Sequence, residues 1–148
     1  MKIYLDNCCL NRPFDDQTQI RIRLEAEAVL LVLAECVKGN WEWVGSEILD
    51  LEINRIPDAE RKRRIQTIAS HVNYLVVVGE LETNRAQELE TWSFSAFDAL
   101  HLACAESYGV DILLTVDDKF LKKAAGYGQQ LRIRVENPLT WLKEVTND

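Results

Sequence analysis

Several features that assign many proteins to a class are missing from this sequence. No apolar run approaches the roughly 20 residues that a helix needs to cross a bilayer, so no membrane-spanning segment is expected. The opening residues, Met1 to Asp6, lack a signal-peptide layout, because an acid arrives before an apolar core can develop. We therefore expect the protein to stay in the cytoplasm.

The four cysteines form no CxxC pair, so a zinc site is not expected. Cys8 and Cys9 are adjacent and poorly placed to bridge each other, while Cys36 and Cys104 stand far apart in the sequence. In a reducing compartment all four are expected to be free thiols.

The sequence also lacks an excess of positive charge. Its formal net charge is −7, from 17 Lys and Arg against 24 Asp and Glu. Proteins neutralise nucleic-acid phosphates with Lys and Arg, so this charge counts weakly against such a partner. A carboxylate site for divalent metal would account for part of it. Two basic clusters, residues 61–64 and Lys119 with Lys122 and Lys123, fit an RNA contact and a solvated helix face equally well.

Strand and helix signals alternate along the chain. The 148 residues, 47% of them apolar, fit one domain over 1–148. Residues 7–16 are expected to form a loop, because Asn11, Pro13 and two aspartates favour turns. This alternation predicts an α/β fold with a mainly parallel sheet. Strands are expected over 2–6, 42–45, 74–78, 112–115 and 131–135, and helices over 18–38, 46–55, 58–71, 80–92, 95–108, 119–125 and 138–145.

Two acids end strands of this predicted sheet, where the active site of a parallel α/β protein lies. Asp6 ends the first strand, although a turn residue leaving a strand is a sufficient explanation for it alone. Asp117 ends the strand that begins at Ile112, with Thr115 on the same face. Asp117 could equally cap the next helix, a role that Asp118 could also fill.

Two other acids interrupt apolar helix faces. Glu52 shares a column with Ile48 and Ile56, which should face the core, although a helix rotated by one position would turn Glu52 outward. Asp98 lies in a helix that is apolar nearly all round, and a buried carboxylate needs a partner, a metal or a helix end. A capping box with Ser95 would explain Asp98 and would also keep it ionised.

Together, these positions place Asp6, Asp98 and Asp117 at one rim of the sheet, with Glu52 pointing inward nearby. Like charges at close range repel strongly, so such a cluster persists only when cations neutralise it. Ligation by oxygen alone suits Mg²⁺ or Mn²⁺. The chemistry that uses such ions is phosphoryl transfer.

Four segments resemble the PIN-domain nucleases, a family that includes the toxins of VapC-type toxin–antitoxin pairs. Residues 97–103 match the family's D-A-L-H-L-A signature, and residues 114–120 match its T-x-D-x-x-F segment. Residues 3–7 and 46–52 resemble the segments that hold the family's first aspartate and its glutamate. Order and spacing of all four agree with the family.

The resemblance implies a three-layer fold in which helices flank a central parallel five-stranded sheet. It also implies a Mg²⁺- or Mn²⁺-dependent endoribonuclease that cuts RNA, with an antitoxin partner if it is a toxin, and a homodimer. By this resemblance the catalytic and metal-binding acids are Asp6, Glu52, Asp98 and Asp117, supported by Thr115 and Asn7.

The segment after Asp6 departs from the family, which indicates a distinct subgroup and weakens the toxin assignment more than the nuclease assignment. Asn7 stands where many relatives have Ser or Thr. Arg12 could contact a phosphate or pair with Asp15 or Asp16, the ion pair being favoured, and Lys119 is a second candidate for substrate contact.

His101 shares a helical column with Phe97, Cys104 and Tyr108, so we expect a hydrogen-bonded core histidine rather than a ligand. The main alternative function is a catalytically inactive PIN-like module that binds RNA or protein, motivated by the net charge and the altered segment. A phosphatase that forms an aspartyl-phosphate fits poorly, because Cys8 occupies the place of its second acid.

Overall fold

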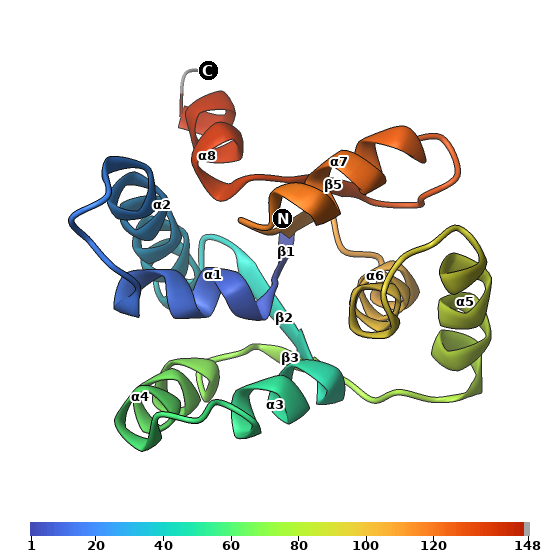
Figure 1. Ribbon diagram of the computed structural model, residues 1–148, viewed down its shortest axis with the longest axis horizontal. Helices are drawn as coiled ribbons and strands as arrows, with labels where there is room; N and C mark the ends of the chain where they lie inside the picture. The colour runs from blue at the N-terminus through green and yellow to red at the C-terminus, as the bar shows by residue number, and fades with distance from the viewer. Residues whose placement is uncertain (147–148) are drawn as a thin grey trace.

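Five parallel strands form the centre of the molecule, in the order β3-β2-β1-β4-β5 (Figure 1). The computed structural model describes residues 1–146. The strands are β1 (Lys2–Leu5), β2 (Glu42–Ser46), β3 (Tyr74–Val76), β4 (Ile112–Leu114) and β5 (Arg134–Glu136). The helices are α1 (Asn7–Asn11), the 3-10 helix η1 (Arg12–Phe14), α2 (Ile20–Val37), α3 (Glu47–Asn54), α4 (Ala59–Ala69), α5 (Glu80–Thr91), α6 (Ala96–Tyr108), α7 (Asp118–Gly126) and α8 (Pro138–Thr146).

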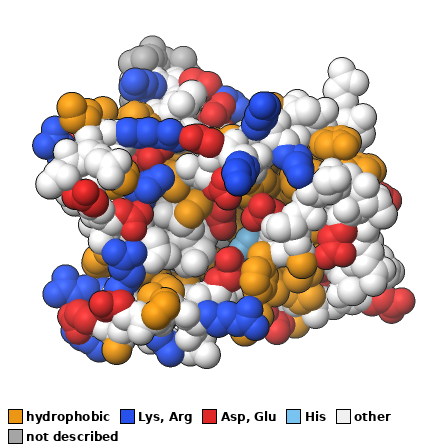
Figure 2. Space-filling view, viewed as in Figure 1, with side chains coloured by type: hydrophobic (Ala, Val, Ile, Leu, Met, Phe, Trp, Pro, Cys, Tyr) orange, Lys and Arg blue, Asp and Glu red, His pale blue; other side chains and the backbone are white. Residues whose placement is uncertain are grey.

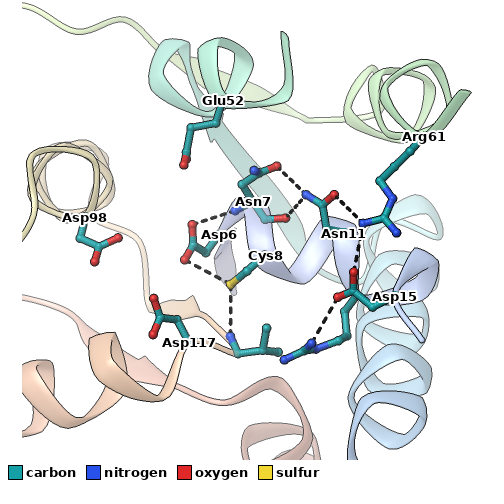
Figure 3. Close-up of a pocket in the computed structure, with 11 residues that line it drawn as sticks. Asp6, Asn7, Cys8, Asn11, Asp15, Glu52, Arg61, Asp98 and Asp117 are labelled. Carbon is teal, nitrogen blue, oxygen red and sulfur yellow. Dashed lines mark hydrogen bonds and ion pairs between the residues drawn. The ribbon is translucent and has the colours of Figure 1, made fainter. Parts of the chain in front are cut away.

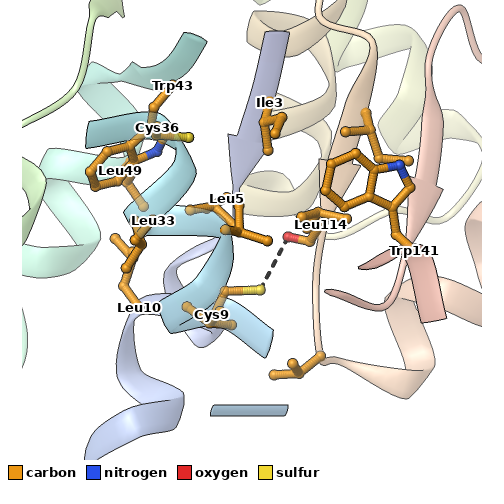
Figure 4. Close-up of a cluster of buried hydrophobic side chains, with 14 of the residues drawn as sticks. Ile3, Leu5, Cys9, Leu10, Leu33, Cys36, Trp43, Leu49, Leu114 and Trp141 are labelled. Carbon is orange, nitrogen blue, oxygen red and sulfur yellow. Dashed lines mark hydrogen bonds between the residues drawn. The ribbon is translucent and has the colours of Figure 1, made fainter. Parts of the chain in front are cut away.

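Helices cover both faces of the sheet, which confirms the predicted three-layer α/β fold. Side chains alternate along β1, so Ile3 and Leu5 enter one core while Tyr4 enters the other. The first core includes residues of α1, α2, α4 and α8, and the second includes residues of α5, α6 and α7. In Figure 4 the first core surrounds Leu5, with Trp43 and Trp141 on either side of it. Burial on both faces explains the nearly continuous apolar character of β1 and β4.

The loop expected over residues 7–16 was wrong, because this segment forms α1 and η1. The Asp6 side chain caps α1 by accepting a hydrogen bond from the Asn7 backbone nitrogen at 2.8 Å. Cys9 and Leu10 are buried in the first core and hold the short helix against the sheet. Asn11 is therefore the last residue of α1, and Pro13 lies within η1.

Other predicted boundaries also shift, and the strand expected over 74–78 ends at Val76. Helix α2 begins at Ile20 rather than Thr18, because Thr18 donates hydrogen bonds to Asp16 in the turn before it. The last strand begins at Arg134 rather than Leu131, and it pairs with β4 over only three positions on each strand. Within residues 1–146, no helix combines the length and the apolar character that crossing a membrane requires. All four cysteines are free, as expected, and only Cys8 is not fully buried.

Candidate active site

The register of β1 and β4 brings Asp6 and Thr115 together, because Leu5 is paired with Leu114 directly before them. Asp6 is buried, and its Oδ2 accepts a hydrogen bond from Thr115 Oγ1 at 2.9 Å. Its Oδ1 accepts from the Asn7 backbone nitrogen. The Asp6 carboxylate is therefore held at the carboxyl edge of the sheet by the segment after β4 and by the first residue of α1.

Asp117 follows β4 and is the N-cap of α7. Its Oδ1 accepts hydrogen bonds from the backbone nitrogens of Lys119 and Phe120 at 2.9 and 3.3 Å. Asp118, the other candidate for this cap, instead pairs with Arg21 at 2.6 Å. Because one oxygen makes both capping bonds, capping and a role in the pocket are compatible for Asp117.

Asp98 lies in the first turn of α6, where its backbone nitrogen donates to Ser95 Oγ at 3.2 Å. This contact is the serine half of the capping box considered above. Burial first, and the nearby charge of Asp6 second, raise the pKa of Asp98 to about 6. The hydrogen bond from Ser95 and the charge of His101 oppose this shift, while Asp117 adds to it. The ion-free carboxylates therefore repel one another.

Glu52 reaches the same region from α3, and its side chain is 22% exposed. Its Oε1 is hydrogen-bonded to Nε2 of His101, a fully buried residue of α6. The Nδ1 of His101 lies 2.6 Å from Tyr4 Oη, and its Nε2 lies 3.7 Å from Asp6 Oδ1. Burial alone would lower the pKa of His101, but the bond to Glu52 and the surrounding carboxylates raise it above its ordinary value.

His101 was thus correctly predicted to be buried and hydrogen-bonded, yet it lies among the predicted acids rather than in an apolar core. The signal that could have shown this is its spacing, since residues three apart on a helix share a face and His101 follows Asp98 by three.

The four predicted acids line one pocket of about 520 Å³ and point into it from four different elements (Figure 3). They are Asp6, Glu52, Asp98 and Asp117. Cys8, which sequence reasoning did not single out, also lines it, and its Sγ lies 3.3 Å from Asp6 Oδ2. The other lining residues are Asn7, Asn11, Arg12, Asp15, Arg61 and Val116.

Ion pairs hold the far end of the pocket. Asp15 bridges Arg12 and Arg61 at 3.2 and 3.0 Å, so the favoured pairing of Arg12 is found with Asp15. Arg12 also contacts the buried Glu25, with 3.2 Å between Nε and Oε1. Asn7 belongs to this end as well, since its side-chain oxygen accepts from Asn11 Nδ2 at 3.1 Å. Arg12 is therefore part of the pocket wall.

Two smaller hollows adjoin the acidic pocket and share residues with it. One shares Asp98 and Asp117 and contains Lys119 and Lys123. The other shares Glu52 and Arg61 and also contains Arg55. Figure 2 shows acidic side chains around the central hollow, with Lys and Arg side chains nearby on more than one side.

The donor atoms of this pocket suit a hard divalent cation. Ligand atoms of Asp6, Glu52 and His101 lie within 4.8 Å of one another in residues 1–146. Asp98 and Asp117 lie outside that group but line the same pocket. Carboxylate oxygens are the donors that Mg²⁺ and Mn²⁺ prefer, and four carboxylates line this pocket.

Fold and site together define an α/β protein whose polar pocket lies at the carboxyl ends of its parallel strands. The chain belongs to the PIN domain family, whose sequence model matches residues 3–126. Proteins of this family are generally nucleases, and membership supports a hydrolase role. A search among curated proteins found no match for this chain.

Several solved structures share the fold at low sequence identity. VapBC2 from Rickettsia felis, bound to a DNA fragment from its promoter, is 17% identical with a TM-score of 0.61, over 93% of this chain and 98% of that one. VapBC-1 from nontypeable Haemophilus influenzae is 16% identical with a TM-score of 0.57, over 93% and 98%. PAE2754 from Pyrobaculum aerophilum is 15% identical with a TM-score of 0.56, over 100% and 91%.

Proposed function

We propose that this protein is a Mg²⁺- or Mn²⁺-dependent endoribonuclease of the cytoplasm that hydrolyses RNA phosphodiester bonds. The observation that carries the proposal is the convergence of Asp6, Glu52, Asp98 and Asp117 on one open pocket. Four carboxylates in one pocket need cationic compensation, and phosphodiester hydrolysis is the chemistry that such ions serve.

A bound divalent cation would lower the pKa of an attacking water and stabilise the negative charge that develops on the phosphate. Asp6, Glu52, Asp98 and Asp117 would hold the cation. The remaining residues keep these acids in place before substrate arrives. Thr115 and the Asn7 backbone hold Asp6, and the first turn of α7 holds Asp117. Such preorganisation is what makes charged groups effective in catalysis.

The hollows on either side of the acidic pocket support a nucleic-acid substrate. Lys119 and Lys123 lie in one and Arg55 in the other, so phosphates on both sides of a cut would meet positive charge. We assign Lys119 to substrate contact. Arg12 is already paired with Asp15 and Glu25, so contact with a phosphate is its secondary role.

The likeness to two VapBC structures supports a further proposal, that the protein is the toxin of a toxin–antitoxin pair. A homodimer is proposed from the family resemblance alone. An antitoxin would then bind the protein and block the pocket. Co-expression with the product of a neighbouring short gene, followed by size-exclusion chromatography, tests this. Recovery of the protein free of that product, with unchanged RNA cleavage, would count against a toxin pair.

RNA cleavage by purified protein tests the nuclease proposal directly. We expect short single-stranded RNAs to be cut with Mg²⁺ or Mn²⁺, to survive with EDTA, and to survive with Asp98→Asn. Asp50→Asn is a matched control, because Asp50 is an exposed acid on α3 outside the acidic pocket. Metal-supplied protein that binds RNA without cutting it would instead favour the inactive PIN-like module.

A further inference from the structure

His101 connects the acidic pocket to a buried tyrosine. Its Nε2 is hydrogen-bonded to Glu52 Oε1, and its Nδ1 lies 2.6 Å from Tyr4 Oη. Tyr4 Oη lies 2.6 Å from Ser46 Oγ. Ser46 is the N-cap of α3, the helix that carries Glu52, so the chain of hydrogen bonds begins and ends on one helix. Tyr4, Ser46 and His101 are all fully buried.

One arrangement of the protons satisfies all of these bonds at once. In this arrangement Ser46 Oγ accepts from the Leu49 backbone nitrogen at 3.2 Å and donates its own proton to Tyr4 Oη. Tyr4 in turn donates its own hydroxyl proton to His101 Nδ1, 2.6 Å away. A neutral imidazole that accepts at Nδ1 carries its own proton on Nε2. That proton is donated to Glu52.

The reverse direction leads to the same contact at Glu52. If Nδ1 donated to Tyr4 in a neutral ring, the Nε2 lone pair would face a carboxylate oxygen, which is repulsive. A doubly protonated ring removes that repulsion, but it again donates from Nε2. An ionised Glu52 therefore accepts a hydrogen bond from His101 at Oε1 in both of these arrangements, while no hydrogen bond to Glu52 Oε2 is found within residues 1–146.

We propose that His101, oriented by Tyr4, is a positioning residue that binds one carboxylate oxygen of Glu52 and leaves the other for a divalent cation. This inference rests on the proposed function. Hydrogen-bond partners of this kind orient metal-binding side chains, and their loss typically weakens metal affinity or activity about 10–100-fold.

His101 itself is not assigned as a ligand, although it belongs to the group of donors that lie within 4.8 Å of one another. An Nε2 atom that carries a proton toward Glu52 has no lone pair for a cation. The Nδ1 atom is occupied by Tyr4.

Titration with Mn²⁺, followed by calorimetry, tests this role. We expect His101→Ala to bind Mn²⁺ about 10–100-fold more weakly than the natural protein. His101→Gln keeps an N–H donor and should recover most of the lost affinity. The control is His71→Gln, because His71 is exposed and lies outside the pocket. Unchanged Mn²⁺ affinity in His101→Ala would overturn the proposal. Equal weakening in the Ala and Gln variants would also overturn it, because it would indicate that His101 binds the ion directly.

NMR provides a second measurement, which needs no metal ion and whose main result comes from the natural protein. The chain has only two histidines, so ¹⁵N NMR of the natural protein can resolve both rings. We expect a proton on His101 Nε2 without metal, and a changed Nδ1 shift in Tyr4→Phe. A bare Nε2 would refute the positioning role while leaving the nuclease proposal standing. Absence of Mn²⁺ binding by the natural protein would overturn the proposed function and this inference together.

Discussion

The Thr115 hydroxyl joins two acids of the pocket, since Oγ1 lies 2.9 Å from Asp6 Oδ2 and 3.2 Å from the backbone nitrogen of Asp117. A hydroxyl can donate to the first and accept from the second at the same time. The contact ties the end of β1 to the segment after β4. Two segments about a hundred residues apart in the sequence are thereby fixed relative to each other.

Thr115→Val removes this hydroxyl while keeping the shape of the side chain. Because Asp6 then loses a buried donor, we expect the free energy of unfolding to fall by about 1–3 kcal/mol. RNA cleavage should fall at least about tenfold, which corresponds to a rise of roughly 1.4 kcal/mol in the activation free energy. Chemical denaturation and cleavage rates measure the two effects. Thr115→Ser is the control and should restore both; a Ser variant as impaired as Val would refute the hydroxyl's role.

Asp117 serves both as a helix cap and as a pocket acid, and two substitutions separate these roles. Asp117→Ser keeps a capping oxygen and should retain stability within about 0.5 kcal/mol, whereas Asp117→Ala should lose about 1 kcal/mol. Both variants remove the carboxylate, so both should lose RNA cleavage. Thermal unfolding and cleavage assays distinguish them. Full activity in the serine variant would show that the carboxylate is needed only as a cap.

Asp98 should destabilise the ion-free protein at neutral pH. Its pKa of about 6 in the folded state exceeds its ordinary value of 3.8. The protonated carboxyl therefore favours folding below pH 3.8, and this contribution is lost as the pH rises through about 6. We expect Asp98→Asn to raise the free energy of unfolding at pH 7.5 by about 1–2 kcal/mol, less than the full shift implies because partial exposure screens the charge.

Urea denaturation with EDTA present measures this gain. Glu27→Gln serves as the control, since Glu27 is an exposed acid of α2 that lies outside the pocket. Equal or lower stability of Asp98→Asn would contradict the account of charge repulsion in the pocket.

The same raised pKa predicts how cation binding depends on pH. A carboxylate must lose its proton to bind a metal, so protons compete with Mn²⁺ at Asp98 below pH of about 6. We expect the Mn²⁺ dissociation constant to rise about tenfold per pH unit below that point if one proton is displaced. Calorimetry between pH 5 and 7.5 measures the slope. Asp98→Asn should flatten it, and an equal slope in that variant would assign the proton to another group.

Strand and helix alternation was enough to predict an α/β fold with a mainly parallel sheet and the edge of that sheet where acids gather. The three layers and the five strands were implied by the family resemblance. The prediction of this edge worked because β1 and β4 are apolar runs that lead into polar residues. Asp6 directly follows β1, and Thr115 and Asp117 follow β4. Asp98 and Glu52 were found because a carboxylate on an apolar helix face conflicts with burial. The spacing of polar and apolar residues along a single strand or helix is enough to identify such positions.

Contacts between distant segments could not be read in that way. The buried Glu25 accepts from Asn137 Nδ2 at 2.6 Å, across 112 positions of sequence, and nothing local distinguishes it from an exposed helical glutamate. The burial of Cys9 and Leu10 that turns residues 7–11 into a helix depends likewise on packing against the sheet. His101 looked like a core residue because its partner, Glu52, comes from another helix.

Anomalous X-ray diffraction from crystals grown with Mn²⁺ tests the central claim most directly, because it locates the ion without relying on activity. We expect a strong anomalous peak in the pocket, at bonding distance from at least two of Asp6, Glu52, Asp98 and Asp117, and its loss in crystals of Asp98→Asn. A saturating concentration of Mn²⁺ that leaves no peak among these four carboxylates would contradict the account.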